Sequence, residues 1–114
     1  MEKQYKVVHY KENAKDIFQN WLDSLRDLRA KTTIARAVKR MENGNFGVHR
    51  FCRDAVWELV FDIGPGYRVY YSMIDNVVVI HLCAGDKSTQ QKDINKAIKY
   101  LQDFRKENLH YGHQ

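Results

Sequence analysis

The chain has 114 residues, of which 44% are hydrophobic and 29% are charged, and its formal net charge is +5. This composition is that of one folded domain and excludes disorder, collagen-like sequence and low complexity. The longest apolar run, residues 77–80, is far too short to span a bilayer, and no secretory signal is recognisable. We therefore expect a cytoplasmic protein with no membrane association. Its positive charge favours an anionic partner, either nucleic acid or an acidic protein.

The first part of the chain predicts one strand followed by two helices. Residues 5–10 are rich in aromatic and β-branched side chains, which favours a strand. Asn13 is expected to cap the first helix, and residues 43–45 to end the second, because Gly and Asn tolerate the left-handed conformation at a helix C-terminus. Apolar residues recur at helical spacing in both helices: Phe18, Trp21, Leu22 and Leu25, then Ile34, Val38 and Met41.

A β-hairpin is the clearest local pattern. Residues 56–63 and 67–73 alternate with the period of a strand, and the Gly-Pro-Gly segment at 64–66 is typical of a turn. A second turn at Asp75 and Asn76 is expected to lead into the near-continuous apolar strand 77–83.

Gly85 is expected to end this strand, and residues 90–106 to form a last helix. The predicted order is thus β-α-α-β-β-β-α in the α+β class, with two N-terminal helices packed on a small antiparallel sheet. We expect one domain over residues 1–114, with a core of about residues 4–106 and a loose tail over 107–114.

The alternation also predicts two faces for the hairpin. Trp57, Leu59, Phe61, Tyr67, Val69 and Tyr71 are expected to face the helices, opposite to Glu58, Asp62, Arg68 and Tyr70. A charge on a half-buried sheet face is costly unless it is paired. Arg68 therefore either forms a cross-strand ion pair with Glu58, or directs its guanidinium at a phosphate, which it can bind through two hydrogen bonds.

Two further segments are candidate anion sites. Residues 85–90 lie between a strand and a helix start, where Ser88 or Thr89 either simply caps the helix or helps to bind an anion. The glycine spacing of a nucleotide-binding P-loop is missing there. His49, Arg50 and Arg53 form either solvated charge or a patch that holds a phosphate backbone.

The sequence predicts no metal site and no cofactor. The histidines show no metal-ligand spacing with one another or with the cysteines. Cys52 and Cys83 alone make neither a disulfide framework nor a complete zinc site. No motif of a serine hydrolase or a zinc hydrolase is present.

Residues 56–71, V-W-E-L-V-F-D-I-G-P-G-Y-R-V-Y-Y, and residues 84–88, A-G-D-K-S, resemble the RelE/ParE superfamily of type II toxin–antitoxin toxins. The nearest branch is the HigB-like addiction module killer group, and the resemblance covers about residues 4–106. It implies a RelE-like fold and a ribosome-dependent mRNA interferase. Such toxins cut messenger RNA in the ribosomal A site without a metal, through attack of a 2′-hydroxyl on the adjacent phosphate.

The resemblance also implies roles for single residues. Arg68 matches the strand arginine that contacts the scissile phosphate, and Lys87 matches a second basic residue. The chain departs from the family at the strand lysines, replaced by Glu58 and Val60, and at a tyrosine near the last helix, where Lys92 and Asp93 stand. The proton-transfer group is therefore open among Glu58, His49, Asp86 and Asp93. Histidine is the side-chain type best suited to exchange protons near pH 7. Contacts to RNA are expected from Arg50, Arg53, Tyr70 and Lys92.

The partners implied by the resemblance are the ribosome, messenger RNA and a cognate antitoxin, expected to be a helix-turn-helix, HigA-like protein. Operator DNA would be bound only through the antitoxin complex. Two alternatives stay open: a ParE-like toxin that inhibits DNA gyrase without cutting RNA, and a domain that only binds an antitoxin. The mRNA interferase and these two alternatives all share the same fold.

Overall fold

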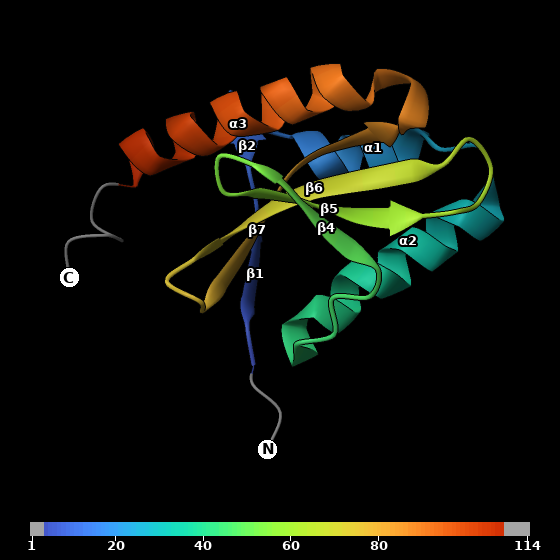
Figure 1. Ribbon diagram of the computed structural model, residues 1–114, viewed down its shortest axis with the longest axis horizontal. Helices are drawn as coiled ribbons and strands as arrows, with labels where there is room; N and C mark the ends of the chain where they lie inside the picture. Colours follow the sequence, from blue (N-terminus) through green and yellow to red (C-terminus); the bar gives the residue numbers. More distant parts are fainter. Residues whose placement is uncertain (1–3, 109–114) are drawn as a thin grey trace.

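The computed structural model describes residues 4–108, which form an α+β domain with a five-stranded sheet and three α-helices (Figure 1). The strands and helices follow one another along the chain with these bounds: β1 Lys6–His9, β2 Lys11–Glu12, β3 Lys15–Asp16, α1 Ile17–Ser24, α2 Leu28–Arg40, β4 His49–Arg53, β5 Val56–Phe61, β6 Tyr67–Ile74, β7 Val78–Asp86 and α3 Gln90–Glu107. Two short 3-10 helices complete the order, η1 Met41–Asn43 and η2 Lys87–Thr89.

The sheet is mixed, with the strand order β1-β7-β6-β5-β4. Strands β5 to β7 form the antiparallel meander of the predicted order, and β4 adds a fourth strand beyond the three of that order. The expected wholly antiparallel sheet is wrong at β1, which pairs with β7 in parallel, Val7 opposite Val79. Parallel neighbours need a crossover connection, and here the chain between them passes through both N-terminal helices and the rest of the meander.

In three of the hairpin turns, two successive residues both have a positive φ. The turns are Asn13–Ala14, Asp54–Ala55 and Asp75–Asn76. This conformation matches the twist of paired strands, and Asn and Asp tolerate it better than most residues. The turn at Asp75 and Asn76 is confirmed. Asn13 does not cap a helix: it belongs to the turn of a small extra hairpin, β2–β3, which the predicted order lacked.

Helix ends differ from expectation by a few residues. Asp16 caps α1 by accepting from the backbone N–H of Gln19 at 2.9 Å. Asp27 caps α2, and that helix leads through η1 to Gly44 with φ 82°, the expected left-handed stop. β7 continues past Gly85 to Asp86, and α3 extends to Glu107, so the tail expected to be loose starts later than residue 107. The rest of that tail, residues 109–114, lies outside the described residues.

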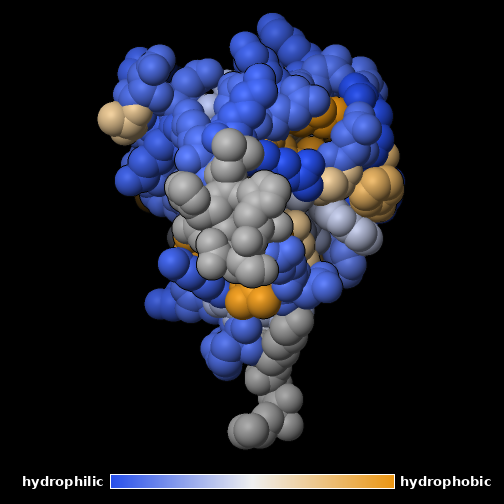
Figure 2. Space-filling view, turned by 90° about the vertical axis from the view of Figure 1, so that its left-hand side faces the viewer, coloured by the Kyte–Doolittle hydropathy of each residue, from blue (hydrophilic) through white to orange (hydrophobic). Residues whose placement is uncertain are grey.

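Helices cover both faces of the sheet, with α1 and α2 on one side and α3 on the other (Figure 1). The predicted faces of the hairpin are confirmed for the residues of the two strands, whereas Asp62 lies just past the end of β5. Leu59, Val69 and Tyr71 pack in the core beneath α1 and α2, whereas Tyr70 packs in the core beneath α3. Glu58 and Arg68 share the α3 side with Tyr70, because they follow the same alternation. The surface seen in Figure 2 is mostly hydrophilic, with small separate hydrophobic areas.

No helix within residues 4–108 is long and apolar enough to cross a membrane.

Candidate anion-binding site

Arg68 is a buried arginine held by the turn that precedes it. It lies in the second position of β6, and its side chain is only 6% exposed. Its Nη1 donates to the carbonyl oxygens of Gly66, at 3.1 Å, and Tyr67, at 3.4 Å. Its Nε is buried and has no hydrogen-bond partner among residues 4–108. An unsatisfied donor on a fixed cation is costly in a closed core, and it is what a site for an anion requires.

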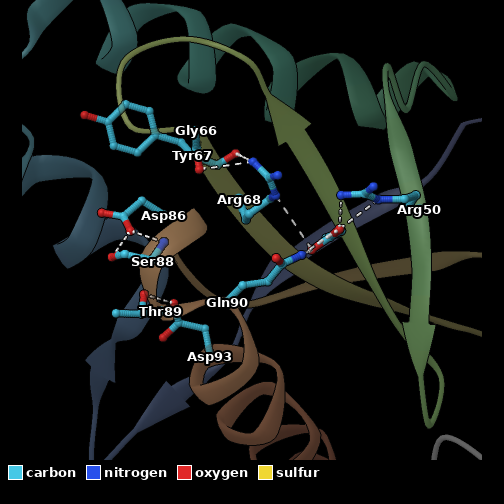
Figure 3. Close-up of polar contacts among 10 residues, drawn as sticks. Arg50, Gly66, Tyr67, Arg68, Asp86, Ser88, Thr89, Gln90 and Asp93 are labelled. Carbon is cyan, nitrogen blue, oxygen red and sulfur yellow. Dashed lines mark hydrogen bonds and ion pairs between the residues drawn. The ribbon is translucent and has the colours of Figure 1, made fainter.

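Glu58 gathers hydrogen bonds from two other elements. Its carboxylate is 3% exposed and accepts a hydrogen bond from Nε of Arg50 on β4 at 3.0 Å, and Nη2 of Arg50 forms an ion pair with the same oxygen at 2.9 Å. Gln90, the first residue of α3, donates its Nε2 to the other oxygen at 3.0 Å. Figure 3 shows Arg50 and Gln90 reaching toward the same point, one from β4 and the other from the start of α3. The carboxylate therefore ties β4, β5 and the start of α3 together.

The expected ion pair between Arg68 and Glu58 is present only as a close approach. The Nε of Arg68 is 4.0 Å from Oε1 of Glu58. Arg68 stands opposite Val60, and Glu58 stands opposite Tyr70, so the two charges meet along the diagonal of the ladder. Arg68 and Arg50 thus both lie close to the Glu58 carboxylate, but only Arg68 is buried, whereas the Arg50 side chain is 61% exposed.

Gly66 lets the turn pass close to the guanidinium of Arg68 and the Cβ of Lys87. Its φ of 81° is a left-handed value that favours glycine. A Cβ at this position would lie 3.3 Å from Nη1 of Arg68 and 3.5 Å from Cβ of Lys87. The turn, the guanidinium and the start of the Lys87 side chain therefore meet around one point, with the rest of Lys87 exposed.

Asp86 acts as a cap. Its Oδ1 accepts from the backbone N–H of Ser88 at 2.8 Å and from the Ser88 hydroxyl. These hydrogen bonds favour the charged form and lower the pKa of Asp86. The sequence allows Ser88 or Thr89 as a simple helix cap, but in the structure Asp86 caps η2. Thr89 is the residue before α3, and its side chain makes no capping hydrogen bond.

Asp93 is a buried carboxylate pressed against the sheet. It is 7% exposed and accepts from the Thr89 hydroxyl at 2.6 Å (Figure 3). A Cβ on Gly85 would collide with its Oδ2, so the carboxylate occupies the space that a side chain would fill. Gly85 lies opposite Arg68 in the ladder, which places Asp93 on the same side of the sheet as the arginine.

His49 and Tyr70 do not join this cluster. His49 pairs with Leu59, and its ring lies 5.5 Å from that of Trp57, on the side of α1 and α2. Tyr70 is fully buried, and burial raises the pKa of its hydroxyl, so its ring offers no surface to RNA. The structure therefore removes Tyr70 from the expected RNA contacts, and it separates His49 from Arg68 by the thickness of the sheet.

The other residues expected to contact RNA, Lys92 and Arg53, are exposed on the surface. Lys92 is exposed on α3. Arg53 is exposed and bonds Asp54 and the Asn95 side chain. The residue that sequence reasoning missed is Gln90, whose role depends on Glu58, distant in the chain. The sequence shows that Gln90 stands at a helix start, but no spacing rule connects it to a strand carboxylate.

Comparison with known proteins places the chain in a bacterial family. The fold and the site define a small α+β protein with a buried arginine beside the buried carboxylates of Glu58 and Asp93. No protein-family model matches the chain, and no solved structure matches it. A protein of Haemophilus influenzae, described as an uncharacterized protein, is 50% identical over 87 residues, which cover 76% of this chain and 88% of that protein. The chain belongs to the same family as this protein.

Among residues 4–108 no three His, Cys, Asp or Glu side chains are grouped so that they could hold a metal ion.

Proposed function

We propose that this protein is the toxin of a bacterial type II toxin–antitoxin module, in the HigB-like branch of the RelE/ParE superfamily. In this proposal it acts in the cytoplasm and cuts messenger RNA in the ribosomal A site. The resemblance of residues 56–71 and 84–88 supports it. The observation that argues most for the chemistry is Arg68, a buried guanidinium whose Nε has no partner among the described residues.

The proposed reaction needs cations more than any other group. A 2′-hydroxyl attacks the adjacent phosphorus, the bond to the 5′-oxygen breaks, and the products are a 2′,3′-cyclic phosphate and a 5′-hydroxyl. Charge builds up on the non-bridging oxygens of the phosphorane. A fixed guanidinium stabilises that charge without reorganising, which is why we assign this role to Arg68, with Lys87 as the second cation.

Proton transfer is the less defined half of the mechanism. His49 lies on the opposite face, and Asp86 is engaged as a cap. We therefore restrict the proton acceptor to Glu58 or Asp93, which share the α3 side with Arg68. Glu58→Gln and Asp93→Asn are the matched variants, and loss of the true acceptor is expected to slow cleavage by roughly 10²–10⁴-fold.

The proposed partners follow from the same reasoning. A helix-turn-helix, HigA-like antitoxin neutralises the toxin, and its acidic segment is attracted by a chain with net charge +5. The complex, rather than the toxin alone, binds operator DNA. Ribosome and messenger RNA are the targets of the free toxin.

A second candidate is a ParE-like toxin that inhibits DNA gyrase without cutting RNA. The observation that favours it is the state of the acidic groups near Arg68. In the described part of the chain, Glu58 and Asp93 are both buried and both accept hydrogen bonds. A site in which the carboxylates near Arg68 are buried and already hydrogen-bonded suits binding of a target protein better than cleavage of RNA.

One experiment in cells separates the candidates. The chain is expressed from a tightly repressed promoter in a bacterial host, with and without the neighbouring reading frame. Growth arrest with rapid loss of messenger RNA supports the interferase. Arrest with intact messenger RNA and inhibited supercoiling in a purified gyrase reaction supports the alternative. Harmless expression contradicts both and leaves only the antitoxin-binding domain.

A further inference from the structure

The outer edge of β4 offers free backbone groups. Within the described residues β4 pairs with β5 on one side and has no strand on the other. The carbonyl of Val48 accepts from the N–H of Val60 at 2.9 Å, which fixes the alternation of the ladder. By that alternation the N–H and C=O groups of His49 and Phe51 point away from β5. An extended segment laid beside β4 would find these groups unused.

One face of this edge is aromatic. Phe51 is 56% exposed, and its ring stands edge-on to Trp57 at 5.2 Å. His49 contacts the same ring. Beside them lies an open cleft of about 390 Å³, lined among others by Phe46, Trp57 and Tyr71. Apolar side chains of an added strand would be covered here.

The other face of the same edge is basic. Arg50 points to the α3 side and keeps 61% of its side chain exposed although it holds Glu58. Arg53, beyond the bulge of β4, is 48% exposed and reaches Asn95 of α3. Acidic side chains of an added strand would find two guanidinium groups here.

We propose that β4 binds an extended peptide that adds a strand to the sheet and alternates apolar with acidic residues. The alternation follows from the two faces, because successive side chains of a strand point to opposite sides and meet their cross-strand neighbours. The occupant is an acidic segment and not a second copy of this chain. Two copies paired through β4 would bring Arg50 and Arg53 of both chains together, and each chain has net charge +5.

This binding mode goes beyond the proposed function, since it does not require that the cluster at Arg68 cut RNA. It also fits a part of the molecule that the proposed reaction leaves unused, the aromatic face with His49 and Phe51.

The test uses the full chain and a synthetic peptide of about nine residues, the length of a long strand, in which Val and Glu alternate. Binding is followed by amide exchange and by titration of backbone NMR signals. The amides of His49 and Phe51 are expected to exchange fast in the free protein and slowly in the complex. The amide of Arg50, which belongs to a residue paired inward with Glu58, is expected to change little. Added salt is expected to weaken binding, because exposed charges are screened.

The matched variants are Phe51→Ser and Leu28→Ser, which each remove one exposed apolar side chain, the second of them on α2. Phe51→Ser is expected to weaken binding roughly 10- to 30-fold, as loss of an aromatic anchor does, and Leu28→Ser to leave it unchanged. A peptide of the same composition with its Val and Glu residues in separate blocks is expected to bind poorly.

Three results would overturn the proposal. The block peptide could bind as tightly as the alternating one, which would reduce the contact to net charge. The amides of His49 and Phe51 could stay exposed in the complex, which would place the peptide elsewhere. They could also become protected in the free protein as its concentration rises, which would make a second copy the occupant. None of these results bears on RNA cleavage, so failure here is distinct from failure of the proposed function.

Discussion

Arg68 and Glu58 lie on one side of the sheet with their Nε and Oε1 atoms 4.0 Å apart, yet no hydrogen bond joins them. Glu58 instead accepts hydrogen bonds from Arg50 and Gln90, among others. A pair that serves only to hold register would use its best donor on its nearest acceptor. Here the carboxylate of Glu58 lies close enough to balance the charge of Arg68, but it does not accept a hydrogen bond from Nε. The proposed function depends on this Nε being available to a phosphate.

Replacing Arg68 tests that relationship. Arg68→Ala is expected to lower RNA cleavage by roughly 10²–10³-fold, the cost of losing one preorganised charge-stabilising donor. Arg68→Lys is expected to recover little, because an ammonium group has neither the planar fork nor an Nε. Cleavage rates and growth arrest on induction are the measurements.

The matched control is Arg105→Ala, which removes the same charge from an exposed position in the last turn of α3. It is expected to cleave at the wild-type rate. Arg68→Ala protein that is folded by its thermal transition and arrests growth as well as wild type would remove Arg68 from the mechanism.

Replacing Glu58 is expected to lower the free energy of unfolding more than replacing Arg50. Glu58→Gln is expected to lower the free energy of unfolding by about 2 kcal/mol, because it weakens charge-assisted hydrogen bonds in a buried place. Arg50→Ala is expected to cost at most about 1 kcal/mol, since its side chain is mostly exposed and its removal lets water reach the carboxylate. Urea unfolding of the two variants beside wild type measures both. Equal losses would show that the burial of each side chain does not determine how much stability its replacement costs.

Much of the fold could be predicted because the informative signals are local. The alternation on either side of the turn at 64–66 was enough to assign Leu59 and Val69 to one face and Glu58 and Arg68 to the other. The parallel pairing of β1 with β7 could not be predicted, because it joins segments from opposite ends of the chain. The hairpin β2–β3 is too short for a period to show, and Asn13 fits a turn and a helix cap equally well.

Gly85 is expected to be intolerant of a side chain. Gly85→Ala would place a methyl group against the Asp93 carboxylate and 3.1 Å from the Thr89 hydroxyl, at a cost of about 1–3 kcal/mol for overpacking. In the double variant with Asp93→Ala, the space is vacated, so the combined loss is expected to be smaller than the sum of the single losses. Chemical denaturation of the four proteins of this cycle measures the coupling. Additive losses would show that the two residues do not compete for one space.

His81 is expected to make the protein sensitive to acid. It is fully buried, and burial lowers its pKa to about 3 from the ordinary 6.5; the nearby His9 acts in the same direction and Asp16 opposes it. Its Nε2 lies 3.2 Å from the sulfur of Met41, and no partner for Nδ1 is found among residues 4–108. Below pH 6.5 the unfolded chain binds a proton here that the folded chain rejects. Stability is therefore complete above pH 6.5 and falls as the pH drops towards 3.

The slope due to this residue is expected to approach about 1.4 kcal/mol per pH unit between pH 6 and 4. His81→Asn keeps a polar side chain but cannot titrate, so it is expected to reduce the slope by about that amount. Unfolding free energies measured at several pH values for both proteins give the comparison. Parallel curves would mean that His81 is protonated in the folded state or that it titrates alike in both states.

The site was only partly predictable, for a different reason. Arg68 stands out in the sequence because a charge interrupts an apolar strand, and the same reasoning identified Glu58. The exclusion of His49 and Tyr70 needed the face and the burial of each residue, which depend on β4 being a strand and on α3 covering the sheet. Gln90 entered only through a contact between distant elements, which no local pattern encodes.

Whether the chain cuts messenger RNA on the ribosome is tested most directly in a cell-free translation reaction programmed with one defined message. Purified protein is added with and without ribosomes, and new 5′ ends are mapped by primer extension. Cuts are expected only when ribosomes are present and in register with codons, and they are expected to be lost with Arg68→Ala. An intact message in the presence of protein that still arrests growth would contradict the proposed cleavage.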